Sequence, residues 1–373
     1  MKKLFLTISI FLLIFFFQTQ ANALGEDIDS LEEDISGELF SAIDSDVLAV
    51  LEEMGIDEDS IFGVYNFSLD SITSFFSTTL KEKAEKCFKD IFVLLCIIMI
   101  TGAVSSLFIG SKKEVFISQM SVVIITLLMV NFISQSLSAA LSVLKLSGSF
   151  MLCFVPIYTL LISLSGNAAS ALTYNSLIMV FAEVFSSGIT YIASDALGIF
   201  FCFAISFSLN ESINLSRFIN AVNKTVSVTL GMLAGAFTGF LSIKNVLSVS
   251  VDSVSVKSIR FLISSLIPVV GSSISEAYSS LIGSINLIRG SVALVGILVI
   301  VIINLPVILE TLIYYLSFTA LSYLSDGFSG GGRVGETLRC FSCGVRILLL
   351  LCVFEMFILI ISTGIMLSLK GTV

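Results

Sequence analysis

The chain has 373 residues, of which 56% are hydrophobic and only 13% are charged, and its mean hydropathy is +1.05. Soluble domains carry about 25% charged residues, so the composition excludes a soluble protein and predicts an all-α, polytopic membrane protein. The sequence contains no His and no Trp, which excludes His-ligated zinc and catalysis by Ser-His-Asp or Cys-His groups.

The first 23 residues are typical of a secretory signal peptide. Lys2 and Lys3 precede an apolar run from Leu4 to Phe17, and Ala21-Asn22-Ala23 is a small-residue cleavage site. An uncleaved anchor is the alternative, because the apolar run is close to anchor length. Either interpretation carries residues 24–90 across the membrane and makes them extracytoplasmic.

The net charge of −9 is concentrated in that segment, since residues 24–80 contain 15 acidic residues and no Lys or Arg. Nucleic-acid binding needs clustered Lys and Arg, and no such cluster occurs in the sequence. We therefore expect no nucleic-acid partner.

An apolar stripe runs through the acidic segment at intervals of three or four residues. It predicts one amphipathic helix, or two helices broken near Gly37 or Asp44. The acidic faces are either solvated or an interaction surface for a partner. The stripe consists of Ile28, Leu31, Ile35, Leu39, Ile43, Val47, Leu51 and Met54.

A second stripe from Leu69 to Cys87 predicts a helix lying at the membrane surface before the first span. Four lysines near its end conflict with the positive-inside tendency, because the signal peptide places them outside. These lysines are Lys81, Lys83, Lys86 and Lys89.

Residues 91–373 form the predicted membrane domain. A helix needs about 20 apolar residues to cross the hydrocarbon core, and about eight segments qualify on that measure. They are Ile91–Ile109, Val115–Leu137, Ser149–Ser165, Ala171–Ile192, Asp195–Leu209, Val226–Ile243, Ser291–Leu316 and Ile347–Leu369.

Residues 244–290 are ambiguous, because their apolar stretches are short and Pro268 removes a backbone donor. Such interrupted segments are typical of half-helices or re-entrant hairpins. We predict a broken or re-entrant segment whose notable residues are Lys257, Arg260, Pro268, Gly271 and Glu276.

Gly231, Gly235 and Gly239 form a GxxxGxxxG face on one predicted span. Small residues allow close approach of helices in lipid. This face serves either helix packing within the chain or docking to another membrane subunit.

Three acidic residues, Glu183, Glu310 and Glu355, lie well within apolar runs. A charge facing lipid is costly, so these carboxyls should face the protein interior, a cavity or a partner. They are either interior hydrogen-bonded carboxyls or members of a proton or ion relay.

No enzyme signature is found in the sequence. Cys340 and Cys343 form a CxxC, but zinc needs four ligands and no second pair or His follows. The triple glycine Gly330-Gly331-Gly332 lacks the Lys and Ser or Thr of a nucleotide-binding P-loop. We expect no catalytic residues, no metal and no cofactor.

The chain resembles the stage III sporulation protein AE family. The resemblance is carried by the signal peptide and acidic segment, by four further stretches and by their order. These stretches are Phe154-Val155-Pro156, Ser165-Gly166-Asn167-Ala168-Ala169-Ser170, Asp252 to Ala277 with Ile267-Pro268-Val269-Val270-Gly271, and the triple glycine within Ser329 to Val334.

The resemblance implies a subunit of the channel complex that joins mother cell and forespore, needed for forespore development. It implies a mother-cell protein in the outer forespore membrane, with an ATPase and other membrane and ring subunits as partners. It implies no catalytic residues. The alternative from another class is a stand-alone secondary transporter with Glu183 and Glu310 as coupling carboxylates.

Overall fold

The structure is a computed structural model of the chain, and it describes residues 33–56, 64, 69–108, 112–183, 190–209, 217, 219–239, 242–243, 258, 271–327 and 332–367. The regular elements among these residues are all helical, which confirms the predicted all-α class. The long helices are α3 (Leu69–Ser106), α4 (Lys112–Leu164), α8 (Gly271–Asp326) and α9 (Gly332–Leu367). The shorter ones are α2 (Ser45–Glu53), α5 (Ala168–Glu183) and α6 (Thr190–Leu209), and residues 219–239 are also helical.

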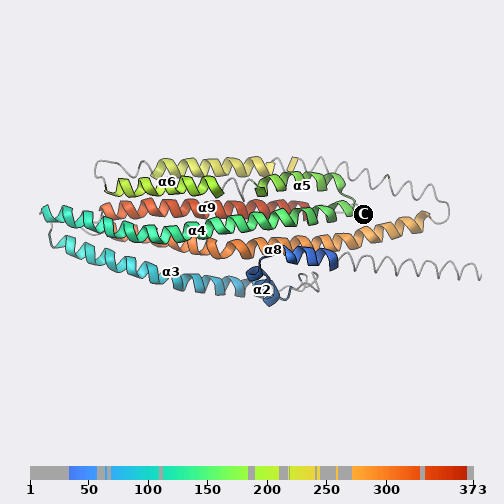
Figure 1. Cartoon of the computed structure of the whole chain (residues 1–373), viewed down its shortest axis with the longest axis horizontal. Coiled ribbons are helices and arrows are strands. Elements are labelled where there is room, and N and C mark those ends of the chain that lie inside the picture. The colour runs from blue at the N-terminus through green and yellow to red at the C-terminus, as the bar shows by residue number, and fades with distance from the viewer. Residues whose placement is uncertain are drawn as a thin grey trace, which may run out of the picture.

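The long helices lie side by side along the long axis of an elongated bundle (Figure 1). α8 and α9 pack together as a helical hairpin, and α4 contacts both of them. α3 covers one side of this central layer and contacts α8 and α4, while α5 and α6 lie on the opposite side (Figure 1).

Four of the described helices are long and apolar enough to cross a membrane. They comprise Asp70–Ser106, Phe116–Leu164, Ser279–Asp326 and Arg333–Gly364. The chain is therefore a multi-pass membrane protein, as its composition predicts.

The spans predicted at Val115–Leu137 and Ser149–Ser165 are parts of one continuous helix, the 53-residue α4. The residues between them contain no Pro, and Ala, Leu and Lys are good helix formers. The two apolar runs therefore predict two spans where the structure has one helix. Such a helix is about 80 Å long, more than twice the thickness of a hydrocarbon core of about 30 Å.

The predicted surface helix and the predicted first span, Ile91–Ile109, are likewise parts of one helix, α3. No Gly or Pro occurs between Leu69 and Thr101, so nothing in the sequence ends the helix where its composition changes from charged to apolar. The predicted boundary at residue 90 therefore lies inside α3.

Two hydrophobic cores follow one another along the bundle. One joins residues 35–56 and Val64 to the later part of α4, α5, the first half of α8 and the end of α9. The other joins α3, the first part of α4, α6, the second half of α8 and the first part of α9. α4 and α8 run through both cores, and each contains an internal proline, Pro156 and Pro306 respectively.

The apolar stripe of the acidic segment is confirmed over its described part. Ile35, Leu39, Ile43, Val47 and Leu51 are buried, while the acidic residues from Glu33 to Glu53 are exposed. The stripe is divided between two helices, one covering residues 33–41 and the other being α2. Asp44 caps α2, because its side chain accepts a hydrogen bond from the backbone N–H of Asp46 at 3.1 Å. Of the two predicted break points, the one near Asp44 is therefore confirmed.

Candidate functional site: the polar contact between α3 and α8

The predicted intramembrane acid Glu310 is paired with two lysines of α3. Lys83 Nζ lies 3.4 Å from Glu310 Oε2, and Lys86 Nζ lies 3.3 Å from Glu310 Oε1. Glu310 itself is only 5% exposed. Each carboxylate oxygen therefore has its own cationic partner, which offsets the cost of burying the charge.

One turn further along, Tyr314 of α8 donates a hydrogen bond from its hydroxyl to Asp90 Oδ2 of α3 at 2.8 Å. The Tyr314 ring stacks on Phe132 of α4 and on Phe318 of α8, with ring centroids 6.3 and 5.5 Å apart. Lys83, Lys86 and Asp90 thus present one face of α3 to α8, and Tyr314 connects this contact to α4. The helices are held in register by charged and polar groups rather than by apolar packing alone.

The lysines near the end of the predicted surface helix conflict with the positive-inside tendency, but several of them have acidic partners within the protein. Lys83 and Lys86 share Glu310, whose single negative charge offsets one of their two positive charges. Lys89 forms a surface pair with Glu85 at 3.6 Å, and such exposed pairs contribute little. Lys83 and Lys86 therefore lie in a different environment from Lys89, which their sequence spacing alone did not show.

Glu355 of α9 is 1% exposed, and within the described part of the chain neither of its carboxylate oxygens has a hydrogen-bond partner. It faces the interior, as predicted for an acid in an apolar run. Glu183 is the last residue of α5, and its side chain lies outside the described part of the structure.

No group of three or more Cys, Asp or Glu side chains suited to a metal ion occurs among the residues that the structure describes. Cys340 and Cys343 are both buried and unbridged on α9. The triple glycine ends with Gly332, the first residue of α9, and its first two residues lie outside the described part.

Among the residues that the structure describes, nothing covers the GxxxGxxxG face. Gly231, Gly235 and Gly239 are exposed, and a Cβ added at any of them would have nothing within 4 Å. Met232, beside these glycines, is 70% exposed. The side of this helix that packs onto the bundle carries other residues, namely Ile219, Val222 and Val226.

Of the predicted broken segment, Lys257, Arg260 and Pro268 lie outside the described residues. Gly271 is the first residue of α8, and Glu276 is an exposed residue in its early turns. The last part of the segment, from residue 271 to residue 290, is therefore regular helix, and we correct its assignment accordingly. The Ser-rich sequence of this part contains no Pro, so the helix proceeds unbroken.

A buried polar turn joins α4 to α5. Gly166 has a φ of 85°, a conformation that favours glycine. Asn167 donates from Nδ2 to the Ser165 hydroxyl at 3.2 Å, and Arg289 of α8 donates to the same hydroxyl at 3.0 Å. The sequence analysis did not identify Arg289, which is the only basic residue in α8. Its position in an apolar helix could have predicted an interior partner, because a charge that faces lipid is costly.

Comparison with known proteins places these observations in a family. The sequence profile of the stage III sporulation protein AE family matches residues 56–369. The stage III sporulation protein AE of Bacillus subtilis (strain 168) is 20% identical over 208 residues, which cover 55% of this chain.

The matched region covers 52% of that relative, so the chain spans about half the length of the curated protein it matches. No solved structure matches the chain. The family match covers most of the chain and includes all four long apolar helices. The protein belongs to the stage III sporulation protein AE family.

Proposed function

We propose that the protein is a membrane-embedded gate or scaffold subunit of the channel complex that links mother cell and forespore. The family match carries this proposal. The multi-pass architecture and the open glycine face support it, because a chain that works within a complex needs helix surfaces left for its neighbours. The proposed role is non-enzymatic.

The proposed location is the outer forespore membrane, with the protein made in the mother cell and residues 1–23 serving as a signal peptide. Residues 24–90 lie on the extracytoplasmic side in this arrangement and meet the ring subunits, while the complex also includes other membrane subunits and an ATPase. Protease treatment of intact protoplasts tests the orientation. Cleavage between residues 24 and 68 supports it, and protection of this segment contradicts it.

The proposed mechanism is assembly through the small-residue face. Because two of the eight predicted spans belong to α4, we now propose about seven crossings for the whole chain, with α5, α6 and residues 219–239 adding to the four long helices. The Gly231, Gly235 and Gly239 face then lies toward a neighbouring subunit, where glycine allows two backbones to approach closely.

Substitution of Gly235 by Leu tests this docking. Nothing lies within 4 Å of the added Cβ, so the protomer should fold normally, and Leu is a better helix former than Gly. The measurement is the amount of the other complex subunits that co-purifies with an affinity-tagged form of the protein. We expect this amount to fall at least about tenfold, since about 1.4 kcal/mol corresponds to a tenfold change in binding. Gly283→Leu is the matched control, because a Cβ added at Gly283 of α8 also has nothing within 4 Å and Gly283 lies outside the Gly231, Gly235 and Gly239 face. Unchanged recovery with Gly235→Leu contradicts docking through this face.

A stand-alone secondary transporter is the second candidate, and Glu355 is the observation that favours it. A buried carboxyl whose oxygens have no partner in the described structure is suited to binding a proton or cation. Glu310 is a weaker coupling group, because Lys83 and Lys86 already occupy both of its oxygens. This candidate requires solute flux by the purified protein in liposomes that is abolished by Glu355→Gln. Absence of flux in the wild-type protein contradicts it.

A further inference from the structure

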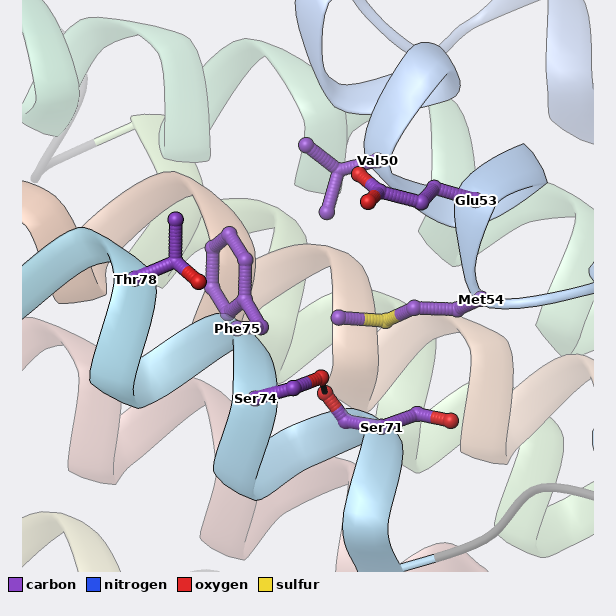
Figure 2. A pocket seen from close by; sticks show the side chains of 7 residues that line it. All are labelled: Val50, Glu53, Met54, Ser71, Ser74, Phe75 and Thr78. Carbon is purple, nitrogen blue, oxygen red and sulfur yellow. Dashed lines mark hydrogen bonds between the residues drawn. The ribbon is translucent and has the colours of Figure 1, made fainter.

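A cavity of about 180 Å³ lies between α2 and the first turns of α3 (Figure 2). Pockets for drug-sized molecules and cofactors measure about 300–1,000 Å³, so this one is too small for them. Its volume suits one long side chain. The lining residues are Val50, Glu53, Met54, Ser71, Ser74, Phe75 and Thr78.

The lining combines an aromatic ring, a carboxylate and hydroxyl groups. Figure 2 shows Phe75 of α3 and Met54 at the end of α2 with the space between the two helices around them, and Glu53 on the α2 side. The Ser74 hydroxyl donates its proton to the Ser71 carbonyl at 2.8 Å. Its oxygen lone pairs are therefore available to accept hydrogen bonds from a ligand.

The one charged residue that lines the cavity, Glu53, is acidic. Residues 24–80 contain no Lys or Arg, and none of the ion pairs formed by the described residues involves Glu53. Glu53 is exposed on the cavity side of α2 with Glu52 next to it. The nearest basic residue in the sequence is Lys81, one turn beyond Thr78, and it does not line the cavity, so a cationic ligand is the complement that the lining itself lacks.

We propose that this cavity receives a single arginine side chain from a partner protein on the extracytoplasmic side. The planar guanidinium stacks on Phe75, forms an ion pair with Glu53 and donates to the hydroxyls of Ser74 and Thr78. The aliphatic stem of the arginine packs on Met54 and Val50. Arginine fits better than lysine, because its five donors and flat face match both the hydroxyl groups and the ring. The assignment rests on the proposed function for the location of residues 24–90.

The test measures peptide binding to the full-length protein in lipid nanodiscs. The probe is a fluorescently labelled pentapeptide, acetyl-Gly-Leu-Arg-Leu-Gly-amide, and its partner probe has citrulline in place of arginine. We expect the arginine peptide to bind at least about tenfold more tightly than the citrulline peptide. Glu53→Gln should abolish this difference.

Two further variants distinguish peptide binding in the cavity from general electrostatic attraction of the peptide to the acidic segment. Glu52→Gln removes the same charge from the neighbouring exposed position, which does not line the cavity, and it should leave binding within about twofold of wild type. Phe75→Leu keeps an apolar group on the underlying core but removes the aromatic face, and it should weaken binding of the arginine peptide. Equal losses in Glu52→Gln and Glu53→Gln, or equal binding of both peptides, overturn the proposal.

Failure of this inference can be distinguished from failure of the proposed function. Recovery of the complex with Gly235→Leu is measured without any peptide. If that variant loses the complex while wild type does not distinguish the two peptides, the arginine site is wrong and the proposed function stands. If the wild-type protein distinguishes the two peptides but recovers no other subunits, the arginine site stands and the proposed function is wrong.

Discussion

Gly296 of α8 lies directly against the ring of Phe154 of α4. A Cβ added at Gly296 would be 2.5 Å from both Cε2 and Cζ of that ring. Phe154 is fully buried and stacks between Phe150 and Tyr158, with ring centroids 5.5 and 5.4 Å apart. The ring cannot move aside without disturbing its neighbours, so the absence of a side chain at Gly296 sets how closely α4 and α8 approach.

We therefore expect Gly296→Ala to lower the free energy of unfolding by about 1–3 kcal/mol through overpacking. The measurement is unfolding in detergent micelles followed by circular dichroism. Gly283→Ala is the control on the same helix, because nothing lies within 4 Å of its added Cβ. That control should be neutral or stabilising by up to about 1 kcal/mol, since Ala is the better helix former. Equal effects of the two substitutions would contradict the close contact.

Glu310→Gln removes the anion that Lys83 and Lys86 share. Hydrogen bonds to charged groups contribute about 1.5–3 kcal/mol, so we expect a loss of that size in the same unfolding measurement. Glu85→Gln breaks only the exposed pair with Lys89 and should cost less than about 1 kcal/mol. Replacing both lysines by Met in the Glu310→Gln background should recover part of the loss, because no ammonium group is then left at this contact without its anion. A loss no larger than that of Glu85→Gln would show that the pairing does not stabilise the fold.

Asp44→Ala removes the N-cap of α2 and should destabilise this helix by about 1 kcal/mol. The change is local, so the measurement is hydrogen exchange at the backbone amides of Asp46, Val47 and Leu48. Asp44→Asn keeps a capping oxygen and should protect these amides nearly as well as wild type. Equal exchange in all three proteins would show that the cap contributes nothing.

Glu355→Met replaces a buried carboxyl by an apolar side chain of similar length. An unsatisfied buried polar group costs about 1–3 kcal/mol, so the variant should be more stable than wild type by an amount of that order. Cys352→Ala, one turn earlier on α9 and also buried, is the control for a change of packing without loss of a carboxyl. A less stable Glu355→Met protein would indicate that the carboxyl binds something that holds the bundle together.

The buried face of the acidic segment could be predicted from the sequence, because an apolar residue at every third or fourth position admits only one helical face. Ile35, Leu39 and Val47 are buried as that spacing requires. The burial of Glu310 and Glu355 could also be predicted, since charged groups do not face lipid without cost.

The length of α4 and the partners of Glu310 could not be predicted in this way. Hydropathy measures how apolar a segment is and does not show whether a helix ends between two apolar segments. The pairing of Lys83 with Glu310 joins residues more than 200 positions apart, so it depends on how α3 and α8 align, which no local pattern specifies.

Pro306 of α8 lies one turn before Glu310. A proline inside a helix lacks the N–H that would bond to the carbonyl four residues earlier, here that of Ile302, and such positions are where helices bend. Glu310 is paired with α3 directly after this point. The longest of the described helices therefore lacks one backbone hydrogen bond beside its ion pairs with α3, so α3 supports α8 where the backbone of α8 supports itself least.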